Sequence, residues 1–549
     1  MAILKKQGTF QTPASNGTLA ITGVGFEPKL VIFHLNHAGD TGLDARVMLG
    51  AATSTEQWVE AGYSGDGDTP SDDRRYVRLT ECIGTLQSSS ITSRASLTSM
   101  DSDGFTLNFV STGSVENITY QAFGGADLDV AVGNVTMPNT TSNFSVSGLS
   151  FEPKAIQIAT CYLPSGAGQS ANFFYNIGAA TATDQFSVYA GSDDNEDPSD
   201  TFRYHSNTSM LKRVQSGGGT PDVVLGFVSL DTTGFTLNSS VPVGTSQQLP
   251  YIAWGGNIDV DITQVTAKNA NGLQEVRGLG FEPDFTYAYT IQAGGSVDNA
   301  TAIGNAAFSL GYSDGTDEFV SAVRALDNKS PSEAFHDALD AFMYTGVNQS
   351  TPWNTATYTP DADGFDLNWT DTDGLTREIF TISFVGLGSG AIQPVGIVSG
   401  EAFGTGVFLN NQTLSPTGVA SGESFGTPII LDSQIVEVSS IVSTEATGTP
   451  TLVPDQVVET TGIVTQEATG VPIILSGSNI TATSIPSEEV IGSHSLHYDQ
   501  IIVVDGIASG EVFGLTILHD GEIQTSPMFR PIFSDVMIEV IREPNDSRT

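Results

Sequence analysis

Three short stretches decide the interpretation of the first two thirds of the chain: GVGFEPK at residues 23–29, GLSFEPK at 148–154 and GLGFEPD at 278–284. Three further landmarks follow each stretch in one order: LGAATS, IGAATA or LGYSDG; then DGFTLN, TGFTLN or DGFDLN; then YQAFGG, YIAWGG or TISFVG. Landmarks that recur in one order at a spacing of about 130 residues indicate tandem copies of one structural unit. We therefore predict three tandem domains.

Each copy contains short apolar runs, such as LVIFHL at 30–35 and AIQIA at 155–159, which are bounded by Gly, Pro, Asn and Asp. Runs of about four to eight residues between turn residues predict an all-β fold, here tandem β-sandwiches of jelly-roll-like type. The proline of each FEP step cannot donate a ladder hydrogen bond, so we interpret this step as a structural corner. One stretch of the third copy, PSEAFHDALDAFM at 331–343, has helical apolar spacing after a serine cap and predicts a short helical insertion.

A second repeat, with a period of 22 residues, begins near residue 392. Its fixed positions are a glutamate, a glycine three residues later, and an aliphatic residue four residues earlier. The glutamates are Glu401, Glu423, Glu445, Glu467, Glu489 and Glu511, and the aliphatic residues are Ile397, Val419, Ile441, Ile463, Ile485 and Ile507. So short a period predicts a small β unit that stacks on its neighbours to bury its apolar face.

The glutamates constrain the shape of this repeat region. In a tight solenoid with one rung per repeat, their carboxylates would stack about 4.8 Å apart and repel one another. Either the units rise by more than one strand spacing, or each glutamate is held by a backbone N–H or a neighbouring chain. We therefore favour two-stranded units strung into a rod, which partner chains would stabilise, most simply in a homotrimer. The apolar run at Val536–Ile541 breaks the period and predicts a terminal cap or docking strand. The predicted domains span residues 1–132, 133–264, 265–390, 391–520 and 521–549.

The composition excludes several classes of function. The chain of 549 residues carries 62 Asp and Glu against 20 Lys and Arg, a net charge of −42. Such a chain cannot neutralise a row of phosphates, so we expect neither a nucleic acid nor an anionic membrane as partner. Only Cys82 and Cys161 are present, which excludes a disulfide scaffold and a cysteine-based zinc site. The opening MAILKKQGTF lacks the apolar run of a signal peptide, so we expect no secretion signal.

Two acidic loops at matching points of the first two copies are the best candidate binding residues. SGDGDTPSDD contains Asp66, Asp68, Asp72 and Asp73, and GSDDNEDPSD contains Asp193, Asp194, Glu196, Asp197 and Asp200. The third copy keeps only Pro331, Ser332 and Glu333 of this pattern. Carboxylates on a loop are ligands that calcium prefers, whereas the plainer interpretation is a solvated loop that maintains solubility. We expect no other cofactor and assign no metal site.

The sequence contains no phosphate-binding glycine loop, zinc-protease motif or serine-nucleophile motif. A carboxylate pair for glycoside hydrolysis is defined by the distance between its two carboxyl groups in space, which the sequence does not show. No candidate pair recurs in the three aligned copies. We therefore predict a protein that is not an enzyme and assign no catalytic residue. The aromatic residues Trp58, Tyr189, Trp353 and Trp369 are candidates for stacking on sugar rings, and core positions are the favoured interpretation.

Two stretches resemble a known class of proteins. The opening MAILKKQGTFQTPASNGTLAITGVGFEPKLVIF resembles the start of virion structural proteins of tailed phages, in which a short strand, a T-G-x-G-F-x-P-K turn and an apolar strand recur. The units GIVSGEAFGTG at Gly396 and GVASGESFGTP at Gly418 are similar to GIASGEAFGTP repeats in the same class. Together the two resemblances span residues 8 to about 520.

The resemblance implies a non-enzymatic virion protein that is assembled in the host cytoplasm. We expect a tail fibre or tail-associated adhesin of a tailed bacteriophage, in which the sandwiches bind host-surface glycan and the rod projects them, with other virion proteins as partners. Weak sites repeated three times per chain would gain avidity. The alternatives are a capsid decoration or head-fibre protein and, from a different class, a polysaccharide depolymerase.

Overall fold

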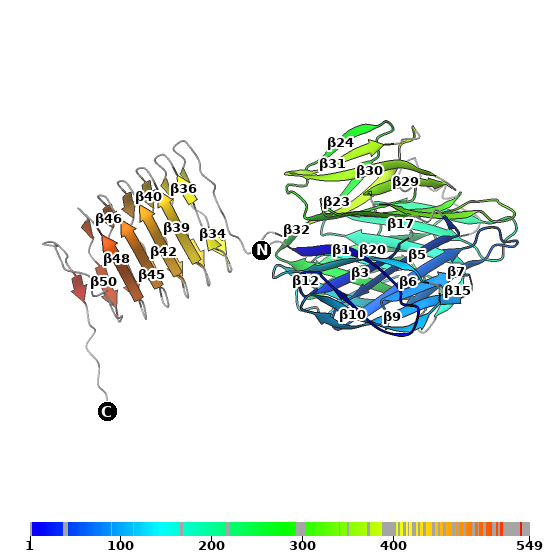
Figure 1. Cartoon of the computed structure of the whole chain (residues 1–549), viewed down its shortest axis with the longest axis horizontal. Helices are drawn as coiled ribbons and strands as arrows, with labels where there is room; N and C mark the ends of the chain where they lie inside the picture. Colours follow the sequence, from blue (N-terminus) through cyan, green and yellow to red (C-terminus); the bar gives the residue numbers. More distant parts are fainter. Residues whose placement is uncertain are drawn as a thin grey trace, which may run out of the picture. The chain divides into compact units, whose positions relative to one another are not determined.

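The structure is a computed structural model. It describes residues 3–36, 42–88, 90–113, 115–164, 168–215, 220–292, 298, 304–339, 341–348, 351–370 and 374–386, followed by short strands between Ala402 and Val540. The chain divides into two compact units, unit 1 at Met1–Gly388 and unit 2 at Ser389–Thr549 (Figure 1). The described residues form strands and turns without a helix, so the prediction of an all-β fold is confirmed.

Copy 1 is a sandwich of a larger and a smaller antiparallel sheet. The larger sheet has the order β1 (Leu4–Gln11), β11 (Asn117–Gly124), β3 (Leu30–Asn36), β5 (Ala45–Ala52), β6 (Gln57–Ser64), β7 (Asp73–Arg78). The smaller sheet has the order β2 (Gly17–Thr22), β10 (Gly104–Thr112), β9 (Ser90–Asp101), β8 (Ile83–Gln87).

Copies 2 and 3 repeat this strand order. The larger sheet of copy 2 is β12 (Leu128–Met137), β22 (Gln247–Gly256), β14 (Pro153–Thr160), β16 (Phe173–Ala180), β17 (Gln185–Ser192), β18 (Thr201–Ser206), and its smaller sheet is β13 (Ser142–Ser147), β21 (Gly234–Val241), β20 (Val223–Asp231), β19 (Leu211–Arg213). In copy 3 the larger sheet is β23 (Ile258–Thr266), β32 (Glu378–Gly386), β25 (Phe285–Thr290), β26 (Ala306–Ser313), β27 (Glu318–Ala325), β28 (Ala334–Leu339), and the smaller is β24 (Gly272–Arg277), β31 (Gly364–Thr370), β30 (Thr351–Asp361), β29 (Met343–Asn348).

The sequence landmarks recur because they contact one another. In copy 1 the Asp103 carboxylate, from the DGF hairpin, accepts hydrogen bonds from the backbone N–H groups of Gly23 at 3.0 Å and Gly25 at 2.7 Å. In copy 3 the Asp363 carboxylate does the same for Gly278 and Gly280. The positive φ of these four glycines is the conformation that L side chains rarely adopt, so the turn requires glycine there.

The LGA-type landmark marks a second close contact. A Cβ atom placed on Gly50, Gly178 or Gly311 would lie within 1.9 Å of a backbone carbonyl oxygen, that of Cys82, Met210 or Phe342, respectively. Each of these residues immediately precedes an edge strand of a smaller sheet, β8, β19 or β29. Glycine is therefore required where the two sheets of each sandwich approach most closely.

The central strands of each larger sheet are buried on both faces. Leu30 and Ile32 of β3 belong to a core that draws residues from all three copies, whereas Val31, Phe33 and Leu35 belong to the private core of copy 1. Alternate side chains of a strand point to opposite faces, so the run LVIFHL is apolar at nearly every position. In Figure 1 the smaller-sheet strands β9 and β10 lie at one edge of unit 1 and β30 and β31 at the opposite edge, with larger-sheet strands between them.

Short strands join the copies in a ring. The strand β15 (Gln169–Ala171) of copy 2 pairs with β7 of copy 1, and β4 (Gly42–Leu43) of copy 1 pairs with β28 of copy 3. Copy 3 contacts copy 2 through Asp298, whose N–H donates to the His205 carbonyl at 3.2 Å. The three copies therefore form one closed unit with approximate threefold symmetry.

The helix predicted at residues 331–343 is wrong, because β28 runs through this stretch and pairs with β27. Ala334 and Ala338 contact the shared core, and Phe335 contacts a separate cluster with Val320 and Tyr344. A strand buried on both faces has apolar residues at almost every position, and such a run also contains the helical spacing. The pairing of β28 with its neighbour decides between the two structures.

The predicted boundaries after residues 132 and 264 lie inside β12 and β23. Both strands pair only within the copy that follows, β12 with β22 and β23 with β32. The boundaries therefore fall before Leu128 and before Ile258. The predicted boundary near residue 390 is close to the division between the two units.

Unit 2 contains three parallel sheets, and each 22-residue repeat contributes to them in turn. The first is β33 (Ala402–Phe403), β37 (Ser424–Phe425), β40 (Glu445–Thr447), β43 (Glu467–Thr469), β46 (Glu489–Ile491), β49 (Val512–Phe513). The second is β34 (Val407–Leu409), β38 (Ile429–Leu431), β41 (Thr451–Val453), β44 (Ile473–Leu475), β47 (His494–His497), β50 (Thr516–His519), β51 (Ile538–Val540). The third is β35 (Thr413–Leu414), β39 (Ile435–Ile441), β42 (Val457–Ile463), β45 (Asn479–Ile485), β48 (Ile501–Ile507), with β36 (Thr417–Val419) also paired to β39.

The strand pairing corrects the expected two-stranded repeat unit. Residues 22 apart are register partners, as in the pair Ile441 and Ile463 or the pair Ile485 and Ile507. In Figure 1 the strands β39, β42, β45 and β48 lie side by side and point the same way. Each repeat is thus one coil of a three-sheet solenoid, because parallel in-register pairing satisfies the backbone of every coil through the next one.

Candidate functional site

The two acidic loops lie together with the equivalent loop of copy 3. These loops, residues 65–73, 193–201 and 326–334, join the two strands at the edge of each larger sheet and contact one another around the approximate threefold axis. We call this contact the three-loop clasp. Each loop contains a Pro-Ser pair after a cis peptide bond, with the serines Ser71, Ser199 and Ser332.

The three serine hydroxyls link the loops in one direction around the ring. Each Oγ donates to a backbone carbonyl of the next loop: Ser71 to Asp193 at 2.9 Å, Ser199 to Leu326 at 2.8 Å, and Ser332 to Gly65 at 2.7 Å. Each Oγ also accepts a hydrogen bond from a backbone N–H of that same loop. A hydroxyl can donate once and accept as well, so these buried serines are satisfied in both roles.

The loop backbones exchange hydrogen bonds in the same cyclic order. The N–H groups of Asn195, Asn328 and Gly67 donate to the carbonyls of Ser71, Ser199 and Ser332 at 2.9, 2.8 and 2.7 Å. These three donors have positive φ, which glycine and asparagine adopt most readily. The clasp therefore depends on a turn residue and a serine at matching positions of all three loops.

Carboxylates complete each junction. Asp194 Oδ1 accepts from the Asp73 N–H at 2.9 Å, and Asp66 Oδ1 accepts from the Ala334 N–H at 3.0 Å. At the third junction Asp327 Oδ1 accepts from the Thr201 N–H at 3.1 Å. One carboxylate per loop is thus used to hold the neighbouring copy.

The other predicted residues have separate partners in the same region. Asp72 accepts from Ser88 Oγ at 2.7 Å, and Arg74 joins the Asp72 and Asp194 carboxylates at 2.7 and 2.6 Å. Asp193 Oδ1 accepts from Asn172 Nδ2 at 3.0 Å. Asp68, Glu196 and Asp200 bond to neighbouring loop residues through the backbone, and the Glu196 side chain is exposed.

Asp73 is the most deeply buried of these carboxyl groups. It has no solvent exposure, and its Oδ2 accepts from Ser192 Oγ at 2.9 Å. Burial raises the pKa of Asp73 to about 7, although hydrogen bonds from serine side chains act in the opposite direction. Burial also raises the pKa of Asp193 to about 6, with a smaller contribution from Asp200 and Glu196.

The clasp brings the predicted acidic residues together as an interface between copies. In the described part of the chain, no group of three or more His, Cys, Asp or Glu side chains has the geometry to hold a metal ion. The geometry therefore gives the calcium interpretation no support. The sequence interpretation missed Ser71 and Ser199, although the Pro-Ser pair retained at Ser332 was a signal that could have identified them.

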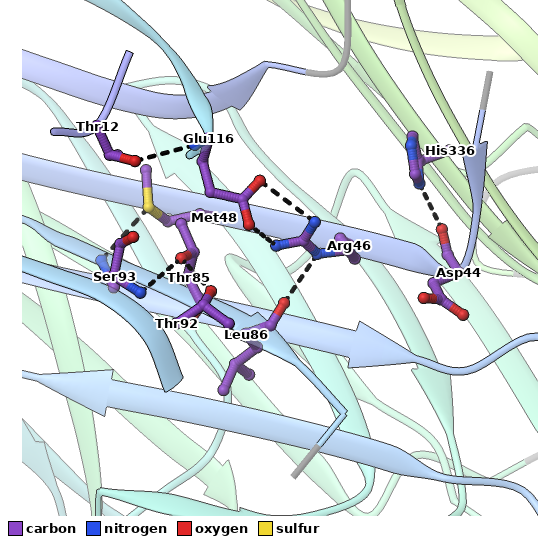
Figure 2. A network of polar contacts seen from close by, with 11 residues as sticks. Thr12, Asp44, Arg46, Met48, Thr85, Leu86, Thr92, Ser93, Glu116 and His336 are labelled. Atoms are coloured by element: carbon purple, nitrogen blue, oxygen red, sulfur yellow. Dashed lines mark hydrogen bonds and ion pairs between the residues drawn. The ribbon is translucent and has the colours of Figure 1, made fainter. Parts of the chain in front are cut away.

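A second contact between copies lies beside β4 (Figure 2). The His336 Nδ1 of copy 3 lies 2.6 Å from the Asp44 carbonyl oxygen of copy 1. Nearby, the buried Arg46 pairs with Glu116 at 2.6 Å and donates from Nε to the Leu86 carbonyl at 2.8 Å. This guanidinium ties the larger sheet of copy 1 to β8 of the smaller sheet, so its role is to hold the sandwich together.

Three of the four candidate sugar-stacking aromatics lie in cores. Trp58, Tyr189 and Trp369 are at most 1% exposed, which matches the favoured core interpretation, and the side chain of Trp353 lies outside the described residues. Among the repeat glutamates, Glu445, Glu467 and Glu489 are register partners on neighbouring strands. The other three, Glu401, Glu423 and Glu511, lie outside the described residues.

Comparisons with known proteins found little similarity to this chain. No family model and no curated protein sequence matches the chain. The catalytic domain of GH87 α-1,3-glucanase in complex with nigerose aligns with 47% of this chain and 73% of its own, at 8% identity and a TM-score of 0.07. Two variants of that domain give the same values. A similarity at this level carries no argument. The described part of the chain offers no candidate for a membrane-spanning helix.

Proposed function

We propose that the chain is a non-enzymatic structural protein of a tailed virus particle, and that it acts as a tail fibre or tail-associated adhesin at the host surface. The observation that carries the proposal is the closed three-copy unit. Its larger sheets meet in one shared core, and that arrangement leaves three smaller sheets on the outside. The resemblance of the opening segment and of the 22-residue repeats to tailed-phage virion proteins supports the same assignment.

The outer strands carry groups that suit contact with sugars. Exposed residues on β2 and β13 include Thr18, Thr22, Asn143, Ser145 and Ser147, whose hydroxyl and amide groups both donate and accept hydrogen bonds. Three similar outer sheets on one body would bind a repeating surface polymer several times. Weak individual contacts then give strong attachment through effective concentration.

Unit 2 has a different role in this proposal. Its stacked coils supply a spacer between unit 1 and the particle, and other virion proteins are its partners. Assembly of the whole chain into a homotrimer is part of the same proposal, since solenoid coils at an open end need a partner or a cap.

The test is immunogold electron microscopy of intact particles with antibody raised against unit 1. Gold at the tail or its tip is the expected result, and preimmune serum provides the control. Gold over the head would replace the adhesin with a capsid decoration or head-fibre protein. Particles without gold, in preparations where the antibody detects the purified chain, would overturn the assignment to the virion.

A further inference from the structure

The three seams between copies differ at equivalent positions of their first strands. The strands β1 and β12 correspond, because each has a glycine that lies against the ring of its register partner, a tyrosine. The two pairs are Gly8 with Tyr120 and Gly133 with Tyr251. The residues that precede Gly8 are Lys5, Lys6 and Gln7, whereas those that precede Gly133 are Val130, Ala131 and Val132.

The lysines fill the seam between copies 3 and 1. Lys5 Nζ lies 3.4 Å from Asp284 Oδ1, and Lys6 Nζ lies 3.6 Å from Asp317 Oδ2. Gln7 Nε2 donates to the Glu318 carbonyl at 3.1 Å. Long side chains therefore cross this seam and pair with the opposite copy.

The seam between copies 1 and 2 has no such side chains at Val130 and Ala131, and a groove of about 590 Å³ lies there. Its lining includes Glu27, Thr55 and Glu56 of copy 1 and Asp129, Ser150 and Phe151 of copy 2. The volume is within the range of about 300 to 1,000 Å³ that is usual for small-molecule sites. We call it the seam groove.

The lining combines hydrogen-bonding groups with one ring. The side chains of Glu27, Glu56 and Asp129 are exposed, and their carboxylates are acceptors for hydroxyl donors. The Phe151 ring is half-buried, with one edge against Gly255. Tyr251 also lines the groove, and burial and then the nearby Glu56 carboxylate raise its pKa.

We propose that the seam groove binds a neutral oligosaccharide, with the carboxylates accepting hydrogen bonds from sugar hydroxyls and Phe151 contacting a sugar ring. This inference rests on the proposed adhesin function and locates its binding site. Three carboxylates line the groove, and the one lysine in the lining, Lys29, donates to the Leu128 carbonyl at 2.6 Å. The excess negative charge disfavours sulfated or sialylated sugars.

The test measures retention of the full chain on immobilised neutral hexose oligomers and on the same oligomers carrying sulfate. Retention on the neutral set only is the expected result. Ala131→Lys, which places at this seam the residue found at Lys6, should reduce retention to background. Glu56→Gln should weaken it about tenfold, because a neutral amide oxygen replaces the charged acceptor of one hydrogen bond.

The matched control is Asp261→Lys. Asp261 holds the corresponding position of β23, at the seam between copies 2 and 3, so this variant should leave retention unchanged. Retention that is the same in Ala131→Lys as in the unmodified chain would overturn the proposal. So would a lack of retention on every neutral oligomer by a chain with an intact unfolding transition. Gold labelling of the tail together with either result would leave the adhesin function standing and reject only the seam groove.

Discussion

Both units of this chain are built by repetition, but they tolerate change differently. The copies of unit 1 are about 130 residues long, pair antiparallel and each possess a private core, so their acidic loops have diverged while the clasp serines persist. The repeats of unit 2 are 22 residues long and pair in parallel register, so like residues become neighbours. A repeat with its own core can therefore vary its surface, whereas a solenoid repeat brings equivalent strand residues next to one another.

The largest expected effect comes from the shared core of unit 1. Trp254 has no exposure, and its ring lies 5.4 Å from Phe123, 5.9 Å from Phe285 and 4.7 Å from Phe384, so it contacts copies 1 and 3. Trp254→Ala should lower the free energy of unfolding by about 3–5 kcal/mol through the cavity it leaves. Fluorescence of the remaining tryptophans, which all lie in unit 1, would report the change in copies 1 and 3.

Trp369→Ala is the matched control, since Trp369 is equally buried but belongs to the private core of copy 3. It should loosen copy 3 before the others. If Trp254→Ala leaves the fluorescence transition of copies 1 and 3 unchanged, the shared core does not couple the copies.

A smaller loss is expected where the two sheets of one sandwich meet. A Cβ on Gly178 would lie 1.6 Å from the Met210 carbonyl oxygen, so Gly178→Ala forces the sheets apart and should cost about 1–3 kcal/mol. Gly226 of β20 has open space around its Cα, so Gly226→Ala should be neutral or slightly stabilising. Chemical denaturation of both variants checks the difference, and equal stabilities would refute the close approach.

The clasp should make unit 1 sensitive to pH. The pKa of Asp73 in the folded state, about 7, exceeds the value of about 3.9 for an unfolded chain, so the folded state holds the proton over this interval. Stability should therefore fall as pH rises from about 4 to about 7, and Asp73→Asn should flatten that slope. Melting temperatures from pH 4 to 8 would test this, with the exposed Asp197→Asn, in the corresponding loop of copy 2, as control. An unchanged slope in Asp73→Asn would contradict the expectation.

The smallest effect is expected in unit 2. Glu467 has Glu445 and Glu489 as register partners on strands about 4.8 Å away. Relief of repulsion by Glu467→Gln should stabilise the repeats by about 0.2–1 kcal/mol at low salt and by less at molar salt. Hydrogen exchange of the β43 amides would measure the change, and a decrease in protection would show that the glutamate column is favourable.

The sequence predicted those features that repetition makes visible. Spacing alone identified the three copies, and turn residues identified the β class. The closure of the copies depends on Ser71, Ser199 and Ser332, and no local pattern shows that hydroxyls 128 and 133 residues apart meet around one axis. The sequence also failed to predict the strand β28. A strand that is buried on both faces is apolar at almost every position, so its apolar run fits helical and extended spacing equally.

The expectation of a two-stranded repeat unit in unit 2 was incorrect for a different reason. Repulsion between glutamates was weighed against one coil per repeat, but the parallel pairing of the described strands outweighs it, since their backbone groups find partners in the next coil. Charge repulsion between carboxylates is modest in water. It therefore adjusts the stability of a solenoid without selecting the fold.

Hydrogen exchange of the clasp in Ser199→Ala, compared with the exposed control Ser145→Ala, tests the closed three-copy unit most directly. Ser199→Ala removes the hydroxyl that contacts Leu326 and Lys329 and should cost about 1–3 kcal/mol. If the three copies form one closed unit, exchange should speed up together at Asn328, at Asn195 and at Gly67, one at each junction. Faster exchange at Asn328 alone would show three independent sandwiches and contradict the closed three-copy unit.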